Sequence, residues 1–386
     1  SNNTAVGFSS LAANTTGAKN TAVGRGSLQL NTTGGDNVAV GDFALYSNTT
    51  ASSNTAVGGD TLSNNTTGAN NTAIGDDALA ANTTGASNVA VGANALDANT
   101  TGDQNIAIGV HALSGVTTGS FNTALGHEAL FANTTASNNT AVGRFALISN
   151  TTGNSLTAVG ANALAANTTA NQNTAFGSFA GDAITTGAGN HAIGASALGT
   201  LTTGGENTGL GLAAGFDLTT GSNNLLLGFN AGRSTAPSGS ITTGSNNVCL
   251  GDNNISNLFC ADTSISSSDS RDKTDVADFS IGLKWIEALR PVTYRWDRRT
   301  WYGTDADPYG TPDGSKKRTK THIGFLAQEA LEVEKANGYG SSNDDSLVVN
   351  LTEDGMSYGM KYERLVPILV NAIKELSAKV TALEAG

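Results

Sequence analysis

A repeat of 17 residues runs through most of this chain, without insertion or deletion, from the first residues to beyond position 220. Its unit reads Asn-Thr-Ala-Val-Gly-x-x-Ala-Leu-x-x-Asn-Thr-Thr-Gly-x-x, and its positions 1 to 17 are counted from the first Asn. The unit begins at Asn3, Asn20, Asn37, Asn54, Asn71, Asn88, Asn105, Asn122 and Asn139, and the phase continues at Leu156, Asn173, Asn190, Asn207 and Asn224. A fixed short period is the signature of a solenoid. We therefore expect one elongated solenoid plus the part that does not repeat.

Each unit carries too few apolar residues to build a core of its own. The fifth unit, for example, offers Ala73, Ile74, Ala78 and Leu79. Stacking solves this, because the same side chain from successive coils then forms a continuous buried column. The Thr-Ala-Val-Gly and Ala-Leu segments are β-prone, and Asn-Thr-Thr-Gly consists of turn formers. The pattern predicts a mostly β fold, a parallel β-solenoid with about two short strands per coil, and about fifteen coils at about 4.8 Å make a rod of roughly 70 Å.

The invariant positions of the unit indicate where the backbone is most constrained. Position 5 is glycine in each of the first nine units, which predicts a corner with positive φ or a close backbone approach. Position 15 also admits Ala51, Ala136 and Ala170, so that turn is less constrained. The Asn that opens each unit is expected to stack into a ladder whose side-chain amides hydrogen-bond along the axis.

The Asn-Thr-Thr triplet allows two further interpretations. It has the sequence of a glycosylation acceptor. The matches recur only because the repeat recurs, so they are a single observation, and a role in the turn is preferred. The pair Thr15 and Thr16, repeated every coil, leaves a second function open: a solenoid whose Thr ladder contacts ice or a glycan surface. The triplets considered are at Asn14, Asn31, Asn48, Asn82, Asn99, Asn133, Asn150 and Asn167.

Composition divides the chain into a repeat domain, 1–262, and a C-terminal domain, 263–386. The first carries four Lys or Arg and 13 Asp or Glu, a net charge of −9, and the second carries 16 basic and 19 acidic residues and all three Trp. The acidic repeats offer no basic footprint, so nucleic-acid binding is not expected. No apolar run approaches the roughly 18 to 20 residues that span a bilayer, so no membrane insertion is expected. Ser1 falls at the edge of a repeat, and we expect an anchor upstream of it.

Metal, cofactor and disulfide chemistry receive little support. Cys249 and Cys260 are the only cysteines, which is no disulfide framework; free thiols, a bridge and metal binding stay open. His111, His127 and His191 occupy different positions of the unit and form no metal column. We expect no cofactor and no metal. A conventional glycan hydrolase would need paired carboxylates in a groove, and the repeats offer only scattered Asp.

The C-terminal domain has a mixed α and β pattern. It predicts a helix over 281–289, a strand over 291–296, a polar loop over 298–321, a strand over 323–326, a helix over 327–336 and a strand over 347–351. A final helix, about 362–385, carries an apolar heptad seam with spacings 4, 3, 4, 3, 4, 3. Pro367 lies close to its start or kinks it. The seam consists of Tyr362, Val366, Leu369, Ile373, Leu376, Val380 and Leu383; it implies partner copies in a coiled coil, with packing on its own domain as the alternative.

The repeats resemble a known family. The Asn-Thr-Ala-Val-Gly-x-x-Ala-Leu pattern is similar to the head repeats of trimeric autotransporter adhesins and to repeats in phage tail fibres. The resemblance implies a left-handed parallel β-roll assembled as a homotrimer. That family's unit is usually shorter than 17 residues, which leaves the hand of the coil and the path of Asn-Thr-Thr-Gly open. The repeat also loosens after Asn224, where a longer loop precedes the last unit at Asn247.

The C-terminal domain resembles the self-cleaving intramolecular chaperone of phage endosialidase tailspikes, tail fibres and some membrane-bound transcription factors. The resemblance rests on Ser268-Asp269-x-Arg271-x-Lys273, residues 291–296, the segment 322–329 that includes Gln328 and Glu329, and residues 372–376. It implies a domain that trimerises, aligns three chains and is then cut off before the motif serine.

The resemblance assigns single-turnover self-cleavage to the Ser267-Ser268 bond. Ser268 attacks the preceding carbonyl and Lys273 is the base, because a hydroxyl needs a base to take its proton. Lysine serves only when neutral, so its site must desolvate it, as burial in a trimer would. Asp269 and Arg271 either form an ion pair that orients the turn or stay solvated.

Identical coils explain why a repeat needs such a domain. Chains that pair out of phase by one unit bury nearly the same surface, so register is weakly specified. We therefore expect a homotrimeric fibre or adhesin of a phage tail or bacterial surface, located on the virion or outside the cell, that attaches to a host glycan or protein receptor.

Overall fold

The computed structural model describes residues 2–255, 276–303, 309–342, 345–351 and 358–386. Contacts divide the chain into two compact units. One comprises residues 1–236 and 241–252 and contains the repeats; the other comprises 237–240 and 253–386. The expected boundary at 262 and 263 lies outside the described residues.

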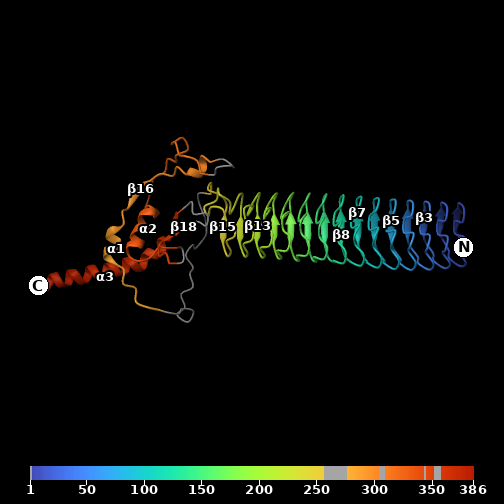
Figure 1. The fold of residues 1–386 in the computed structure, drawn as a ribbon, viewed down its shortest axis with the longest axis horizontal. Coiled ribbons are helices and arrows are strands. Elements are labelled where there is room, and N and C mark those ends of the chain that lie inside the picture. Colours follow the sequence, from blue (N-terminus) through green and yellow to red (C-terminus); the bar gives the residue numbers. More distant parts are fainter. Residues whose placement is uncertain (1, 256–275, 304–308, 343–344, 352–357) are drawn as a thin grey trace. The chain divides into compact units, whose positions relative to one another are not determined.

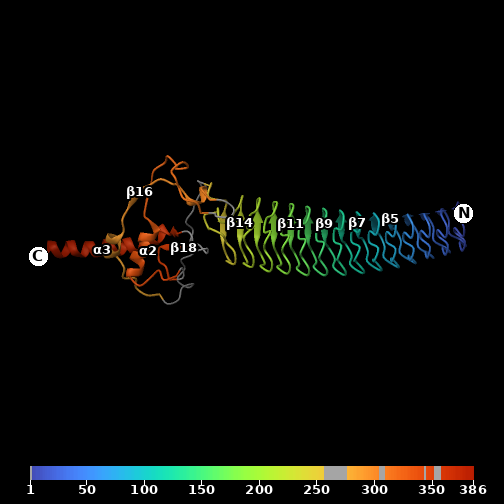
Figure 2. The same ribbon diagram turned by 45° about the horizontal axis from the view of Figure 1, so that its top comes forward.

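The compact unit that contains the repeats is a parallel β-solenoid, as predicted. Fifteen strands of three residues pair in chain order in a single sheet, and the strands lie side by side in Figures 1 and 2. Pairing is in register with the repeat, so that Ala158 lies opposite both Ala141 and Ala175. The strands are β1 Thr4–Val6, β2 Thr21–Val23, β3 Val38–Val40, β4 Thr55–Val57, β5 Thr72–Ile74, β6 Val89–Val91, β7 Ile106–Ile108, β8 Thr123–Leu125, β9 Thr140–Val142, β10 Thr157–Val159, β11 Thr174–Phe176, β12 His191–Ile193, β13 Thr208–Leu210, β14 Leu225–Leu227 and β15 Val248–Leu250.

The expectation of two strands per coil is wrong, because the Ala-Leu segment forms a turn. The leucine at position 9 adopts left-handed backbone angles, with φ of 50° at Leu28 and 54° at Leu79, and its side chain is fully buried. Left-handed backbone costs roughly 1–2 kcal/mol at such a residue, whereas burial of a leucine contributes about 1.5–3 kcal/mol. Burial therefore outweighs the β propensity from which the second strand was predicted.

Three columns of small and aliphatic side chains form the solenoid core. In the fifth coil they are Ala73, Ala78 and Leu79, each 0% exposed. The glycine at position 5 behaves as predicted on both counts: Gly92 has φ +133°, and a Cβ there would lie 2.6 Å from the carbonyl oxygen of Gly109.

Two ladders of buried asparagines run along the solenoid. At position 1, the predicted ladder is confirmed: Asn37 donates its backbone N–H to Asn20 Oδ1 at 3.0 Å, and its Nδ2 donates to the Ala51 carbonyl at 2.9 Å. At position 12, the Asn of the triplet forms a second ladder, in which Asn48 Nδ2 donates to Asn31 Oδ1 at 2.9 Å. These triplet asparagines are fully buried from Asn31 to Asn167, so their role is structural.

The C-terminal unit is a small α+β arrangement. Its helices are α1 Leu283–Ala288, α2 Ala327–Ala336 and α3 Leu365–Glu384, with short 3₁₀ helices η2 Arg299–Trp301 and η3 Tyr362–Arg364. Two antiparallel strand pairs join β16 Val292–Tyr294 to β17 His322–Gly324 and β18 Val349–Leu351 to β19 Tyr358–Met360. Trp285, Val348, Leu365 and Ile368 form the buried core. Every predicted element of this region is present, and β19 is an addition.

Candidate functional site

The residues predicted to perform the cleavage lie in a segment that the structure does not describe. Ser267, Ser268, Asp269, Arg271 and Lys273 all fall between 256 and 275, outside the described residues, as does Cys260. The described residues show the geometry of much of the C-terminal unit and of its exposed surfaces.

Helix α3 has two faces of different character. Leu365, Ile368 and Ala372 are buried against the rest of the C-terminal unit, at 6%, 1% and 5% exposure. The predicted seam lies outside this face: Ile373 is 66% exposed and Leu383 is 82% exposed. Among the described residues, the seam from Val366 to Leu383 is exposed and does not pack on its own domain, whereas Tyr362 contacts Phe325 through its ring and its hydroxyl. The helix begins at Leu365, which leaves Tyr362 in η3 and Pro367 in the first turn.

The buried side of α3 holds the segment that precedes α1. Asn371 Nδ2 donates to the carbonyls of Phe279, at 2.5 Å, and Ile281, at 3.3 Å. One turn later, a carboxylate oxygen of Glu375 accepts the backbone N–H of Leu283 at 3.3 Å. A Cβ at Gly282 would lie 2.1 Å from Glu375 Oε1, so any larger residue there would have to displace this carboxylate. The 372–376 segment of the chain thus serves to fix the entry of α1.

The Gln328 and Glu329 pair occupies the first turn of α2. Glu329 accepts two hydrogen bonds from the Arg290 guanidinium, one from Nε at 3.1 Å and one from Nη2, and this pairing lowers the pKa of the Glu329 carboxyl. Both side chains are exposed to solvent, and Gln328 is exposed as well. The contact attaches the start of the β16 segment to α2.

Glu334 is a buried carboxylate that the sequence did not single out. It is 0% exposed and accepts hydrogen bonds from Ser346 Oγ at 2.9 Å and from the backbone N–H groups of Leu347, Val348 and Val349 at 3.2, 2.5 and 2.9 Å. Arg364 Nη1 donates to the carbonyls of Ser346 and Leu347 at 3.4 and 3.3 Å. The backbone N–H groups around the start of β18 therefore bind Glu334 of α2, and the carbonyls of the segment before β18 bind Arg364 of η3.

An aromatic cluster covers the β16 and β17 pair. Tyr294 stacks on His322 with ring centroids 5.6 Å apart, and Trp296 approaches the same imidazole edge-on at 6.3 Å. The Arg298 guanidinium lies 4.3 Å from the Trp296 ring centre, and its burial lowers the pKa of that guanidinium. His322, which had no firm role in the sequence, packs here as a strand residue.

The outer face of the solenoid sheet carries an unbroken apolar column at position 4. Ten of its fifteen members are between 36% and 59% exposed, and none is polar. The column consists of Val6, Val23, Val40, Val57, Ile74, Val91, Ile108, Leu125, Val142, Val159, Phe176, Ile193, Leu210, Leu227 and Leu250. Exposed apolar strips of this size are typical of surfaces that contact proteins, membranes or ligands.

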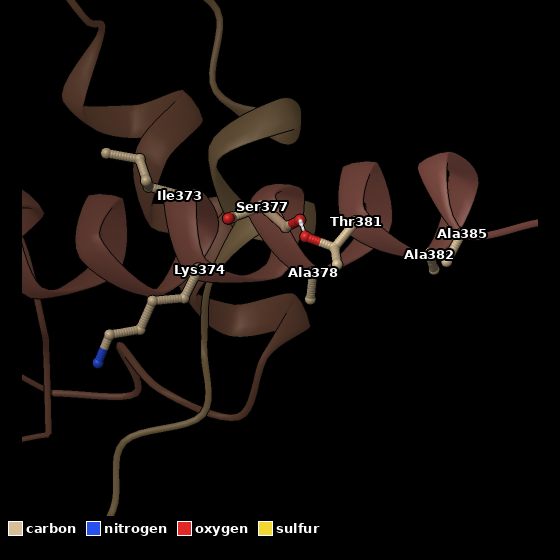
Figure 3. A pocket seen from close by; sticks show the side chains of 7 residues that line it. All are labelled: Ile373, Lys374, Ser377, Ala378, Thr381, Ala382 and Ala385. Atoms are coloured by element: carbon tan, nitrogen blue, oxygen red, sulfur yellow. Dashed lines mark hydrogen bonds between the residues drawn. The ribbon is translucent and has the colours of Figure 1, made fainter.

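A shallow hollow lies beside the seam on α3. Its lining of small side chains is shown in Figure 3, where Thr381 Oγ1 donates to the Ser377 carbonyl at 3.0 Å. Ile373 and Lys374 border it at one end and Ala385 at the other. All of its lining residues belong to this one helix and its C-terminal cap, so the hollow is open to solvent.

Residues 268–339 match the family model Peptidase_S74, described as chaperone of endosialidase. This part of the C-terminal unit is similar to chaperone-of-endosialidase domains. A search of curated proteins and a search of solved structures each found no match. The β-solenoid followed by this intramolecular chaperone domain is the architecture of a tail-fibre-like structural protein, as the sequence predicted.

Two properties of the described residues complete this picture. In those ranges, no helix combines the length and the apolar character needed to cross a membrane. Cys249 is buried, and its Sγ accepts the backbone N–H of Gly232 at 3.2 Å. Within the described part of the chain no three His, Cys, Asp or Glu side chains gather as metal ligands would.

Proposed function

We propose that three copies of this chain assemble into a fibre shaft of a phage tail or a bacterial surface, matured by one self-cleavage. The chaperone-of-endosialidase domain supports the assembly, since that family implies trimers. A host receptor, a glycan or a protein, is part of this proposal, and nucleic acid is not.

The observation that carries the proposal is the pair of exposed apolar surfaces, the position 4 column and the α3 seam. A column of fifteen coils at about 4.8 Å per coil can be covered along its length only by a straight apolar surface of the same pitch. Another copy of this solenoid supplies such a surface. The seam adds a second apolar strip with the spacing of a coiled coil.

The proposed role of the chaperone domain is to set register. Parallel β-structure between chains folds slowly and exposes sticky surface while it does so. A C-terminal trimer that forms first fixes the number of chains and their phase. Cleavage at Ser267-Ser268 by Ser268 and Lys273 then removes the template, and the fibre is left kinetically stable.

The Thr-ladder alternative receives support from only half of each pair. The first Thr donates its hydroxyl to the next coil, as Thr83 Oγ1 does to the Thr100 carbonyl at 3.0 Å. The second, Thr84, is exposed. A thermal-hysteresis assay on the purified chain tests this alternative, and activity there would favour ice binding over the fibre.

Assembly is tested by Ile373→Asp, with Lys374→Asp as the matched control. Both change an exposed α3 residue to the same acid, but only the first places a charge in the seam. We expect light scattering after size exclusion to give trimers for the wild type and the control, and a loss of trimers for Ile373→Asp. Equal masses for the two variants would contradict the role of the seam.

Self-cleavage is tested by intact mass. We expect the wild type to yield two fragments divided between Ser267 and Ser268, and Ser268→Ala and Lys273→Ala to stay full length. If all three show the same full-length mass, the cleavage part of the proposal is wrong, while the assembly test above stands separately.

A further inference from the structure

The solenoid has one corner whose side chains do not follow the repeat. Positions 6, 7 and 10 follow the corner glycine at position 5, and their residues change from coil to coil, whereas positions 1, 3 and 5 barely change. In the coil beginning at Asn88 they hold Ala93, Asn94 and Asp97, and in the coil beginning at Leu156 they hold Ala161, Asn162 and Ala165. Small residues therefore satisfy this corner structurally.

Three consecutive coils depart from that pattern together. Their corner carries a group of aromatic, imidazole and charged side chains, here named the corner patch: His111, His127, Glu128, Phe131, Arg144 and Phe145. The His111 ring packs edge-on against Phe131 of the next coil, at 6.1 Å between centroids. The His127 ring packs in the same way against Phe145, at 5.6 Å, and the Arg144 guanidinium lies 4.7 Å from the Phe145 ring centre.

The polar groups of the corner patch are held at its surface. Glu128 Oε1 lies 3.7 Å from His127 Nε2. Phe131 is 40% exposed, and His127 and Arg144 are exposed as well. The patch thus presents an apolar ring beside a guanidinium donor, a carboxylate acceptor and two imidazoles, over a length of three coils.

Position 7 has left-handed backbone at Phe43 and Phe179 as well as in the corner patch, so a bulky residue there carries a backbone cost wherever it occurs. Position 7 is left-handed in the coils that begin at Asn3 through Asn224, and the corner patch places His111, Glu128 and Phe145 there, with φ of 56°, 54° and 62°. Asn tolerates this conformation better than a bulky residue does, and Asn94 and Asn162 occupy the same position elsewhere at φ 54° and 56°. Strained residues kept against local preference concentrate at functional sites.

We propose that the corner patch binds an uncharged saccharide. An aromatic ring offers a rigid apolar surface at low entropic cost, which suits the C–H face of a pyranose ring. The Arg144 fork and the Glu128 carboxylate donate to and accept from hydroxyls at the rim of that ring. One Arg and one Glu leave the patch balanced, in a repeat domain of net charge −9 that repels anions.

This surface is separate from the assembly surfaces. The apolar column is formed by position 4 of the strands and the corner patch by positions 6, 7 and 10 beyond the glycine corner. The inference therefore adds a ligand class for the shaft and does not depend on the trimer.

The test titrates the full chain with neutral hexasaccharides of glucose, mannose and N-acetylglucosamine and with an acidic uronate oligomer. Phe131→Ala copies Ala80 and Ala165, which hold position 10 in other coils, and Phe145→Asn copies Asn162. Ser63→Ala, at position 10 of a distant coil, is the control.

We expect at least one neutral oligomer to bind the wild type and the control alike. Phe131→Ala and Phe145→Asn should each weaken that binding about tenfold or more. Phe145→Asn should at the same time raise the thermal unfolding midpoint, because it relieves left-handed strain. If Phe145 were only structural, its replacement would not weaken binding while raising the midpoint. The inference is overturned if no neutral oligomer binds, if only the uronate binds, or if both variants bind as the wild type does.

Discussion

Replacing Asn65 by Asp tests whether the amide ladder at position 12 holds the coils together. Asn65 is fully buried; its Nδ2 donates to Asn48 Oδ1 at 3.0 Å and to the Gly68 carbonyl at 2.9 Å, and its Oδ1 accepts from Asn82 Nδ2 at 2.8 Å. The adjacent Asn64 is exposed. Asn64 Nδ2 donates to the Ala80 carbonyl of the next coil at 2.9 Å, so the same substitution at these two neighbours compares the buried ladder with one exposed bond between coils.

The expected cost follows from the two bonds that the amide donates. An ionised carboxylate cannot donate, so Asn48 Oδ1 and the Gly68 carbonyl lose their donor and face a negative oxygen at about 3 Å. Each unpaired buried acceptor costs about 1–3 kcal/mol, which gives about 2–6 kcal/mol for Asn65→Asp before the cost of burying the charge. Asn64→Asp should stay within about 0.5 kcal/mol of the wild type.

The cost should depend on pH in a defined direction. Burial raises the pKa of an introduced carboxyl above its value in the unfolded chain, near 4. The folded state then binds the proton more tightly, so the variant is most stable at low pH and loses stability as pH rises through the raised pKa. The protonated acid also donates one of the two lost bonds.

Guanidinium unfolding followed by far-ultraviolet circular dichroism at pH 4 and pH 7 measures both quantities. We expect Asn65→Asp to unfold well below Asn64→Asp at pH 7 and the gap to narrow at pH 4. Because each coil contacts only its neighbours, hydrogen exchange should show the loss concentrated around the substituted coil. A gap below about 0.5 kcal/mol at pH 7 would refute the ladder as a source of stability.

Three further substitutions test other features of the repeat. Val116 interrupts the position 12 ladder, and Asn99 Oδ1 has no partner among the described residues. Val116→Asn would supply that donor, so it should unfold at no lower denaturant concentration than the wild type. Val116→Ala should instead lower the free energy of unfolding by about 2 kcal/mol. Asp77→Asn should raise the free energy of unfolding at pH 7 by about 0.5 kcal/mol or less. Burial and then neighbouring aspartates raise the pKa of Asp77, so the wild type should recover the difference by protonation as the pH falls. Gly92→Ala should lower the thermal midpoint more than Gly102→Ala, because only Gly92 has a positive φ, of +133°; equal losses would contradict the backbone argument.

The period alone predicted most of the solenoid, because a parallel coil has one register that keeps each core column intact. Ala158 between Ala141 and Ala175 is an example. The turn at position 9 was not predictable from propensity, since a left-handed leucine is stable only when the stacked coils bury it. The burial of position 12 did have a signal in the sequence: Ile184 and Leu201 replace Asn there in later coils, and an aliphatic replacement indicates an inward position.

The C-terminal unit was predictable in its local elements and less so in its long-range contacts. Helix α2 lies where its apolar spacing placed it, at Ala327–Ala336. The burial of Glu334 depends on backbone donors 13 to 15 residues further along the chain, which no local pattern reveals. The exposure of the seam at Ile373 followed from its spacing, while the geometry of Ser268 and Lys273 stays a prediction.

In the proposed trimer, the shaft and the seam would correct each other's errors of register. A shift of one coil between chains removes the contacts of only one strand in fifteen along the position 4 column, so the shaft alone tolerates it. A shift of one heptad along α3 moves a chain by about 10.5 Å, while coils advance by about 4.8 Å and two coils by about 9.6 Å. The two steps do not coincide, so the two elements do not tolerate the same errors of register. Aperiodic residues such as Leu156, which stands where the ladder has Asn, add to the same selection. In the proposed trimer, the α3 seam has a different period from the shaft and can therefore fix the register that the shaft leaves open. This is a physical reason for such a seam to follow a 17-residue repeat.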